Sequence, residues 1–208
     1  MAVAKKAKKI GETRFLQEFR ALTGENQEMI LEGYAVIYDV PATHNCGIGY
    51  LFTEVIKRGA LDHCDMSDVP LKYNHNDGHM ILARTRNGSL ELIRDDRGLK
   101  IRATLIDTTS NRDIYKAVNS GLLDKMSFSF TVAEHGDSWS YGDNSASRTV
   151  TNINKLYDVS LVDVPFYDST SVYARTLELL ESSRPGELES IEFRKRRQIS
   201  ILKLMEAY

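Results

Sequence analysis

The stretch SLELIRDDRGLKIRATLID, residues 89–107, contains two runs in which apolar and polar side chains alternate. Alternation with a period of two is typical of a strand that buries one face and exposes the other. The runs flank the sequence DDRG, residues 95–98, which places Gly98 where a positive φ is wanted in a tight turn. The stretch therefore predicts an antiparallel β-hairpin, the clearest one in the chain.

Similar runs on both sides of this hairpin predict a β-rich body. Upstream, alternation or short apolar runs indicate strands within residues 28–40, 51–56 and 69–85, and downstream within 125–130 and 149–165. Two segments are expected to be loops because of their Gly, Asn, Ser and Pro content, PATHNCGIGY (41–50) and AEHGDSWSYGDNSASR (133–148).

One helix is expected between the hairpin and the strand at 125–130. In TTSNRDIYKAVNSG, residues 108–121, Thr109 or Ser110 can cap the N-terminus and Gly121 can end the helix. The apolar face of this helix consists of Ile114, Ala117 and Val118.

The fold class predicted from these elements is α+β, a mainly antiparallel, barrel-like β-sheet with a few flanking helices. We divide the chain into a flexible basic arm (1–12), a main domain (13–176) and a C-terminal tail with a helix (177–208).

Composition limits the classes of function. The chain has 208 residues, a formal net charge of −2 and 42% hydrophobic residues, so we expect a soluble protein that is not built to bind nucleic acid. Two cysteines fit a reducing compartment, no apolar run has the length of a membrane span, and the N-terminus does not resemble a secretory signal.

The strand at 125–130 contains two candidate nucleophiles. Met126, Phe128 and Phe130 would share one face and anchor it in the core, while Ser127 and Ser129 would share the other. A rigidly held serine suits nucleophilic attack, but serines on the solvated face of a half-buried strand show the same pattern. Alternation does not distinguish Ser127 from Ser129.

A serine needs a base, and imidazole is the usual one. Of the five histidines, His75 follows the run PLKYN and can be held at a strand end. His79 lies four residues later, a spacing that on a helix would suit a metal ion, but the intervening NDG favours a turn. The other histidines are His44, His63 and His135.

The imidazole in turn needs an orienting acid. LYDVSLVDVP, residues 156–165, offers Asp158 and Asp163 on opposite faces of a strand, with Asp158 on the same face as Ser160. Only one of the two acids could face a given cleft, and either could also be a solvated strand-edge charge.

Two further features are alternatives to a serine site. Cys46 lies near His44 and could act as a thiol nucleophile, although closeness in sequence is not the geometry required. RKRR, residues 194–197, could contact nucleic acid or a protein partner, or could be a solvated helix face.

Taken in order, several segments resemble the HK97-type phage prohead (procapsid maturation) proteases, serine proteases with the herpesvirus assemblin-like fold. The matching segments cover roughly residues 30–175: EGYAVIYDV, FTEVIKRGALD, PLKYNHNDGHMILART, GLKIRATLIDT, AVNSGLLDKMSFSFTV and LYDVSLVDVPFYDSTSVYA. No single segment is highly specific to this family, but the order of the whole set along the chain is specific.

The resemblance implies a catalytic triad. The family histidine falls on His75, with Ala83 and Arg84 downstream, the nucleophile on Ser127 and the acid on Asp158. The sequence departs from the family in having Asp158 where a Glu is common. It also departs at Asn76, where the family often has Asp.

The resemblance further implies the biological setting. It predicts a serine endopeptidase without a cofactor or metal ion that cleaves the major capsid protein, its scaffolding segment and itself. The enzyme would act inside the phage procapsid in the host cytoplasm, without membrane or nucleic-acid partners, and could form an oligomer. The alternative is a non-catalytic capsid assembly or scaffolding protein that keeps the protease fold.

Overall fold

The computed structural model describes residues 19–24, 27–45, 50–78 and 80–163. The predicted basic arm (1–12) and C-terminal tail (177–208) lie outside the described residues. Within the described part of the chain, no helix is long and apolar enough to cross a membrane.

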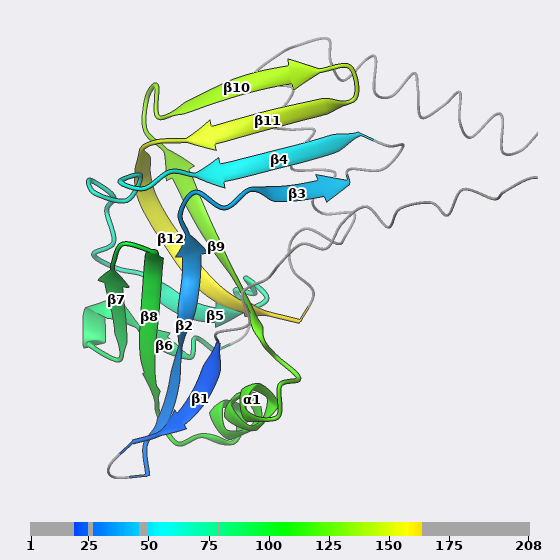
Figure 1. The fold of residues 1–208 in the computed structure, drawn as a ribbon. Coiled ribbons are helices and arrows are strands. Elements are labelled where there is room, and N and C mark those ends of the chain that lie inside the picture. Colours follow the sequence, from blue (N-terminus) through cyan, green and yellow to red (C-terminus); the bar gives the residue numbers. More distant parts are fainter. Residues whose placement is uncertain (1–18, 25–26, 46–49, 79, 164–208) are drawn as a thin grey trace, which may run out of the picture.

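The described chain is mostly β-strand and forms three four-stranded sheets (Figure 1). Sheet I contains, in spatial order, β1 (Arg20–Thr23), β2 (Met29–Ile37), β8 (Gly98–Leu105) and β7 (Leu90–Arg94). Sheet II contains β10 (Asp137–Gly142), β11 (Ser145–Val150), β4 (Leu51–Ile56) and β3 (Ala42–Asn45). Sheet III contains β6 (Ala83–Arg84), β5 (Pro70–Tyr73), β12 (Ile153–Val162) and β9 (Lys125–Val132).

The predicted β-rich architecture is confirmed, but a barrel is not. In a closed barrel every strand pairs with two neighbours, whereas each sheet here has two terminal strands within the described residues. Most strand pairs are antiparallel, as expected, but β11 pairs with β4 and β12 pairs with β5 in parallel. The described helices are one α-helix, α1 (Thr109–Asn119), and one short 3₁₀ helix, η1 (Thr85–Asn87).

The predicted hairpin is β7 and β8, but the role expected for its glycine is wrong. Gly98 is not among the residues with a positive φ. Instead, a Cβ at this position would lie 1.9 Å from the carbonyl oxygen of Val36 on β2. Gly98 is therefore needed because the backbones of β8 and β2 approach closely beside the register shift between Tyr34 and Val36.

The N-cap of helix α1 lies one residue before the nearer of the two expected caps. Thr108, not Thr109 or Ser110, is the N-cap, and its side chain accepts a hydrogen bond from the Asn111 backbone N–H at 3.2 Å. At the other end Gly121 has φ 74° and donates to the Val118 carbonyl, while Leu122 donates to Ala117. These two bonds form a Schellman motif, which ends the helix and turns the chain toward β9.

Two segments expected to be loops contain strands. Residues 133–148 include β10 and the start of β11, which form an antiparallel hairpin, and residues 41–50 include β3. In the hairpin, Arg148 is buried and bonds to Asp137 at 2.6 Å and to Glu54 on β4 at 3.1 Å. In β11 this buried charge lies between the buried apolar residues Ala146 and Val150 and interrupts the hydrophobic alternation.

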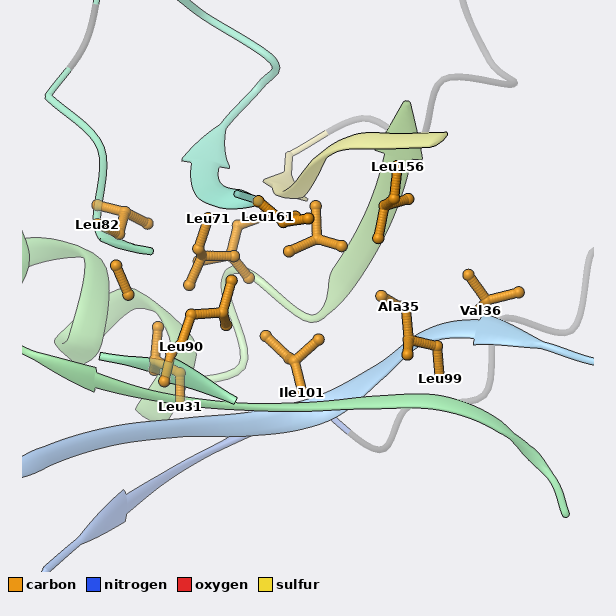
Figure 2. Close-up of a cluster of buried hydrophobic side chains, with 14 of the residues drawn as sticks. Leu31, Ala35, Val36, Leu71, Leu82, Leu90, Leu99, Ile101, Leu156 and Leu161 are labelled. Carbon is orange, nitrogen blue, oxygen red and sulfur yellow. The ribbon is translucent and has the colours of Figure 1, made fainter. Parts of the chain in front are cut away.

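The main core lies between sheets I and III. Figure 2 shows Leu71 of β5 and Leu161 of β12 directed toward side chains of sheet I such as Leu31, Leu90 and Ile101. All five side chains are buried. This packing holds one face of sheet III against the core and leaves the opposite face of the sheet outside the core.

Candidate active site

The face of sheet III that points away from the core is polar. Ser160 of β12 lies opposite Ser127 of antiparallel β9 on one side and opposite Lys72 of parallel β5 on the other. Directly paired residues share a face of the sheet. Because Leu71 and Leu161 face the core, their neighbours Lys72, Ser160 and Ser127 form a polar row on the other face.

A β-bulge brings an acid onto this face. The register pairs Leu156 with Phe130 but Asp158 with Ser129, so Tyr157 is an extra residue on β12. Residues two apart in a regular strand share a face, and the bulge breaks that rule here. Leu156 is therefore in the core, while Asp158 lies with Ser160 on the polar face.

His75 reaches the same face through a tight reversal after β5. Asn74 and His75 have φ values of 54° and 52°, a left-handed conformation that Asn and His adopt more readily than most residues. The Asn74 N–H donates to the Leu161 carbonyl at 2.8 Å, and the Asn76 N–H donates to Tyr73 at 3.1 Å. The reversal is thus anchored to both β12 and β5, and it returns the imidazole toward the polar row.

The imidazole contacts two side chains of β12. His75 Nδ1 lies 2.5 Å from Asp158 Oδ1 and 3.2 Å from Ser160 Oγ. The Ser160 hydroxyl donates to the same Asp158 Oδ1 at 2.8 Å. Because Nδ1 is engaged on this side, Nε2 is the ring nitrogen left to act on a nucleophile.

The surroundings of Asp158 favour its ionised form. Burial of the carboxyl opposes ionisation, but the hydrogen bond and charge of His75, the Ser160 hydroxyl and the Lys72 ammonium outweigh it and hold the pKa of Asp158 below its ordinary value. Lys72 Nζ lies 3.9 Å from Asp158 Oδ2 and 2.5 Å from Asp77 Oδ1. Lys72 therefore also ties the loop after His75 to β5.

Ser127 is close to this group but does not bond to it. Its side chain is largely buried, with 8% of the residue exposed, and it lies opposite Ser160, whose hydroxyl contacts the imidazole. Directly opposed residues have Cβ atoms about 5 Å apart. In the described structure no hydrogen bond joins Ser127 Oγ to His75, whose side-chain contacts are with Asp158 and Ser160.

The other candidates from the sequence lie elsewhere. Asp163 accepts a hydrogen bond from the Tyr73 hydroxyl at 3.2 Å, and His63 and His135 are exposed. His79, Cys46 and RKRR 194–197 lie outside the described residues, as does the side chain of His44. No group of three or more His, Cys, Asp or Glu side chains in the described ranges is arranged to hold a metal ion.

Two residues of the group were not singled out from the sequence, Ser160 and Lys72. A signal for Ser160 was present, because a serine two residues after an acid interrupts an otherwise apolar strand on the same face. Lys72 could not be found in this way, since its pairing with β12 is parallel and depends on distant parts of the chain.

Comparison with known proteins assigns the chain to a family. A family model described as "Caudovirus prohead serine protease" matches residues 17–183, which is most of the chain and includes every residue of the polar group. No curated protein and no solved structure matched.

Proposed function

The chain belongs to the caudovirus prohead serine protease family, and from this premise we propose that Ser127, His75 and Asp158 are its catalytic triad. The resemblance read from the sequence segments is confirmed at the level of the family, which implies a serine peptidase. The observation that best supports the triad is the contact of His75 Nδ1 with Asp158 Oδ1 at 2.5 Å, on the face of sheet III that also presents Ser127.

In the proposed reaction, Ser127 Oγ attacks the scissile carbonyl carbon while His75 Nε2 takes the hydroxyl proton. The tetrahedral intermediate collapses when His75 returns that proton to the leaving amine, which leaves an acyl ester on Ser127. Water then attacks the ester, with His75 again as base, and the acid product and the free serine are restored. Asp158 stays ionised throughout, orients the imidazole and stabilises its cationic form.

Ser127 is preferred to Ser129 because of where His75 enters the site. The last residue of β5, Tyr73, pairs with Leu161, which is next to Ser160 on β12. The chain therefore leaves β5 next to the row of paired residues that contains Ser160 and Ser127. Ser129 lies opposite Asp158, one row further from the backbone of His75. This position of the His75 backbone supports Ser127 rather than Ser129 as the nucleophile.

The family setting supports the proposed substrates and location. We propose that the enzyme acts within the procapsid in the host cell and cleaves the major capsid protein, its scaffolding segment and itself. The residues matched by the family model, 17–183, are close to the main domain of 13–176 that we propose from the sequence.

The test is co-expression of the chain with the major capsid protein of its own phage, followed by mass spectrometry of the products. Ser127→Ala is expected to abolish cleavage of the capsid protein and of the chain itself, whereas the matched variant Ser129→Ala retains both. Unchanged processing by Ser127→Ala would refute the proposed nucleophile. Absence of processing by every variant, the parent included, with capsids still assembling would instead favour a non-catalytic assembly protein.

A further inference from the structure

We propose that Ser160 is a positioning residue that fixes the tautomer of His75, an inference that rests on the proposed function of His75 as the base. Ser160 is wholly buried, with 0% of its surface exposed, so its hydroxyl cannot reach a substrate. A hydroxyl buried in a strand is costly unless it is hydrogen-bonded, and its two partners here are Asp158 and His75.

The three polar groups contact one another in a closed triangle. Ser160 Oγ lies 2.8 Å from Asp158 Oδ1, His75 Nδ1 lies 2.5 Å from the same oxygen, and Ser160 Oγ lies 3.2 Å from His75 Nδ1. Every contact is within hydrogen-bonding distance. The proton positions in this triangle follow from the number of donors available.

The donor count requires the proton of a neutral His75 on Nδ1. An ionised carboxylate only accepts, and a serine hydroxyl has a single proton, which Ser160 donates to Asp158. Both groups that face Nδ1 are therefore acceptors. A bare Nδ1 would oppose two lone pairs, so Nδ1 carries the proton, shared between Asp158 and Ser160, and Nε2 is left unprotonated.

This assignment gives Ser160 a role distinct from that of Asp158. Asp158 supplies the charge and one acceptor for Nδ1–H, whereas Ser160 uses its only proton to hold Oδ1 in place and offers its oxygen as the second acceptor. Without the Ser160 hydroxyl, Asp158 Oδ1 loses one hydrogen-bond donor and His75 Nδ1 loses its second acceptor. The Nε2 atom would then be a base for Ser127 in a smaller fraction of the molecules.

The test uses the full chain and two readouts. The first is the rate at which a fluorophosphonate labels Ser127, a reaction in which the serine oxygen bonds to phosphorus, fluoride leaves and the hydroxyl proton goes to His75. The second is the ¹⁵N chemical shift of each His75 ring nitrogen in histidine-labelled protein, which reports the tautomer directly. The variants are Ser160→Ala, Ser160→Thr and, as a control, Ser147→Ala at an exposed serine of β11.

We expect Ser160→Ala to slow labelling about 10- to 100-fold, the usual effect of losing a hydrogen bond to a charged group. We also expect its ¹⁵N shifts to move toward a mixture of tautomers while the thermal unfolding midpoint stays near that of the parent. Ser160→Thr, which keeps the hydroxyl, should restore most of the rate and the parental shifts, and Ser147→Ala should match the parent.

A parental labelling rate and unshifted ring nitrogens in Ser160→Ala would overturn the inference. So would equal losses of rate in the Ala and Thr variants with unshifted nitrogens, because the hydroxyl would then not matter. The ¹⁵N shifts do not depend on labelling. If Ser127 proves not to be the nucleophile, the tautomer measurement still decides whether Ser160 acts on His75.

Discussion

Asp158 lies on β12 and Asp163 directly follows that strand, and the structure assigns them different partners. Asp158 contacts His75 and Ser160, whereas Asp163 accepts from the Tyr73 hydroxyl. The acid that orients the imidazole is therefore expected to be Asp158, although the resemblance to the family implies a Glu at this position. The shorter side chain still reaches Nδ1 at 2.5 Å, because the reversal after β5 returns His75 toward β12.

Asp158→Asn is expected to slow fluorophosphonate labelling about 10³- to 10⁴-fold, because an amide in place of the carboxylate favours the wrong histidine tautomer. The matched variant Asp163→Asn should label at close to the parental rate. The opposite ranking of the two variants would make Asp163 the orienting acid and would contradict the assignment.

At the scale of elements, two glycines act for different reasons. Gly98 is required by the carbonyl of Val36, which would lie 1.9 Å from an added Cβ. Gly121 has a positive φ of 74° at the end of α1, and an added Cβ there would meet no atom within 4 Å. Gly98 thus avoids a clash with the backbone of β2, and Gly121 avoids the conformational cost that a residue with a side chain pays at a positive φ.

Gly98→Ala is expected to lower the free energy of unfolding by about 3 kcal/mol, because β2 and β8 must separate to admit the methyl group. Gly121→Ala should lower it by only about 1 kcal/mol, the cost of a left-handed alanine in open space. Urea denaturation of both variants measures the difference. Equal losses would contradict the close approach of β2 and β8.

Hydrophobic alternation predicted the strands whose buried face is apolar throughout and missed strands in which a charged residue interrupts that face. It located β2, the β7–β8 hairpin and β9, where apolar side chains recur every second residue. It missed β10 and β11, where the buried charge of Arg148 is paired with Asp137 and Glu54. Ion pairs between strands depend on which strands become neighbours, and a single stretch of sequence does not contain that information.

The sequence also predicted the candidate active site only in part, because its contacts depend on which strands become neighbours. The sequence placed His75 at a strand end and Asp158 on the face of Ser160, and both positions agree with the structure. The contact between them joins residues that are 83 positions apart, and it depends on the parallel pairing of β5 with β12. The roles of these residues came from the family resemblance, since alternation alone left Ser127 and Ser129 equivalent.

At the scale of the whole molecule, sheet I is braced by a cluster of charges on the face opposite the core. Glu32 of β2 is buried and bonds to Arg20 of β1 at 2.9 Å, to Lys100 at 3.0 Å and to Arg102 at 3.1 Å, the last two on β8. The hydrogen bond from Arg20 is the largest cause that lowers the pKa of Glu32. Together with Lys100 and Arg102 it outweighs burial and sets that pKa at about 2.

Because the folded pKa of Glu32 is below the ordinary value of 4.5, the unfolded chain binds the extra proton first as the pH falls. The stability contributed by this cluster should be complete above about pH 5 and should be lost between pH 4.5 and 2. Denaturant unfolding at a series of pH values should show a shallower decline over this range in Glu32→Gln than in the parent. Parallel declines would show that Glu32 is not held by its three partners.

The central claim is that one hydroxyl of β9, that of Ser127, is activated by His75. The most direct measurement is mass-spectrometric mapping of the residue that a fluorophosphonate modifies in the full chain, repeated with His75→Gln. We predict a single phosphonyl adduct on Ser127, and labelling at least about 10³-fold slower in His75→Gln. An adduct on Ser129 or another residue, or labelling of Ser127 that does not depend on His75, would contradict the account.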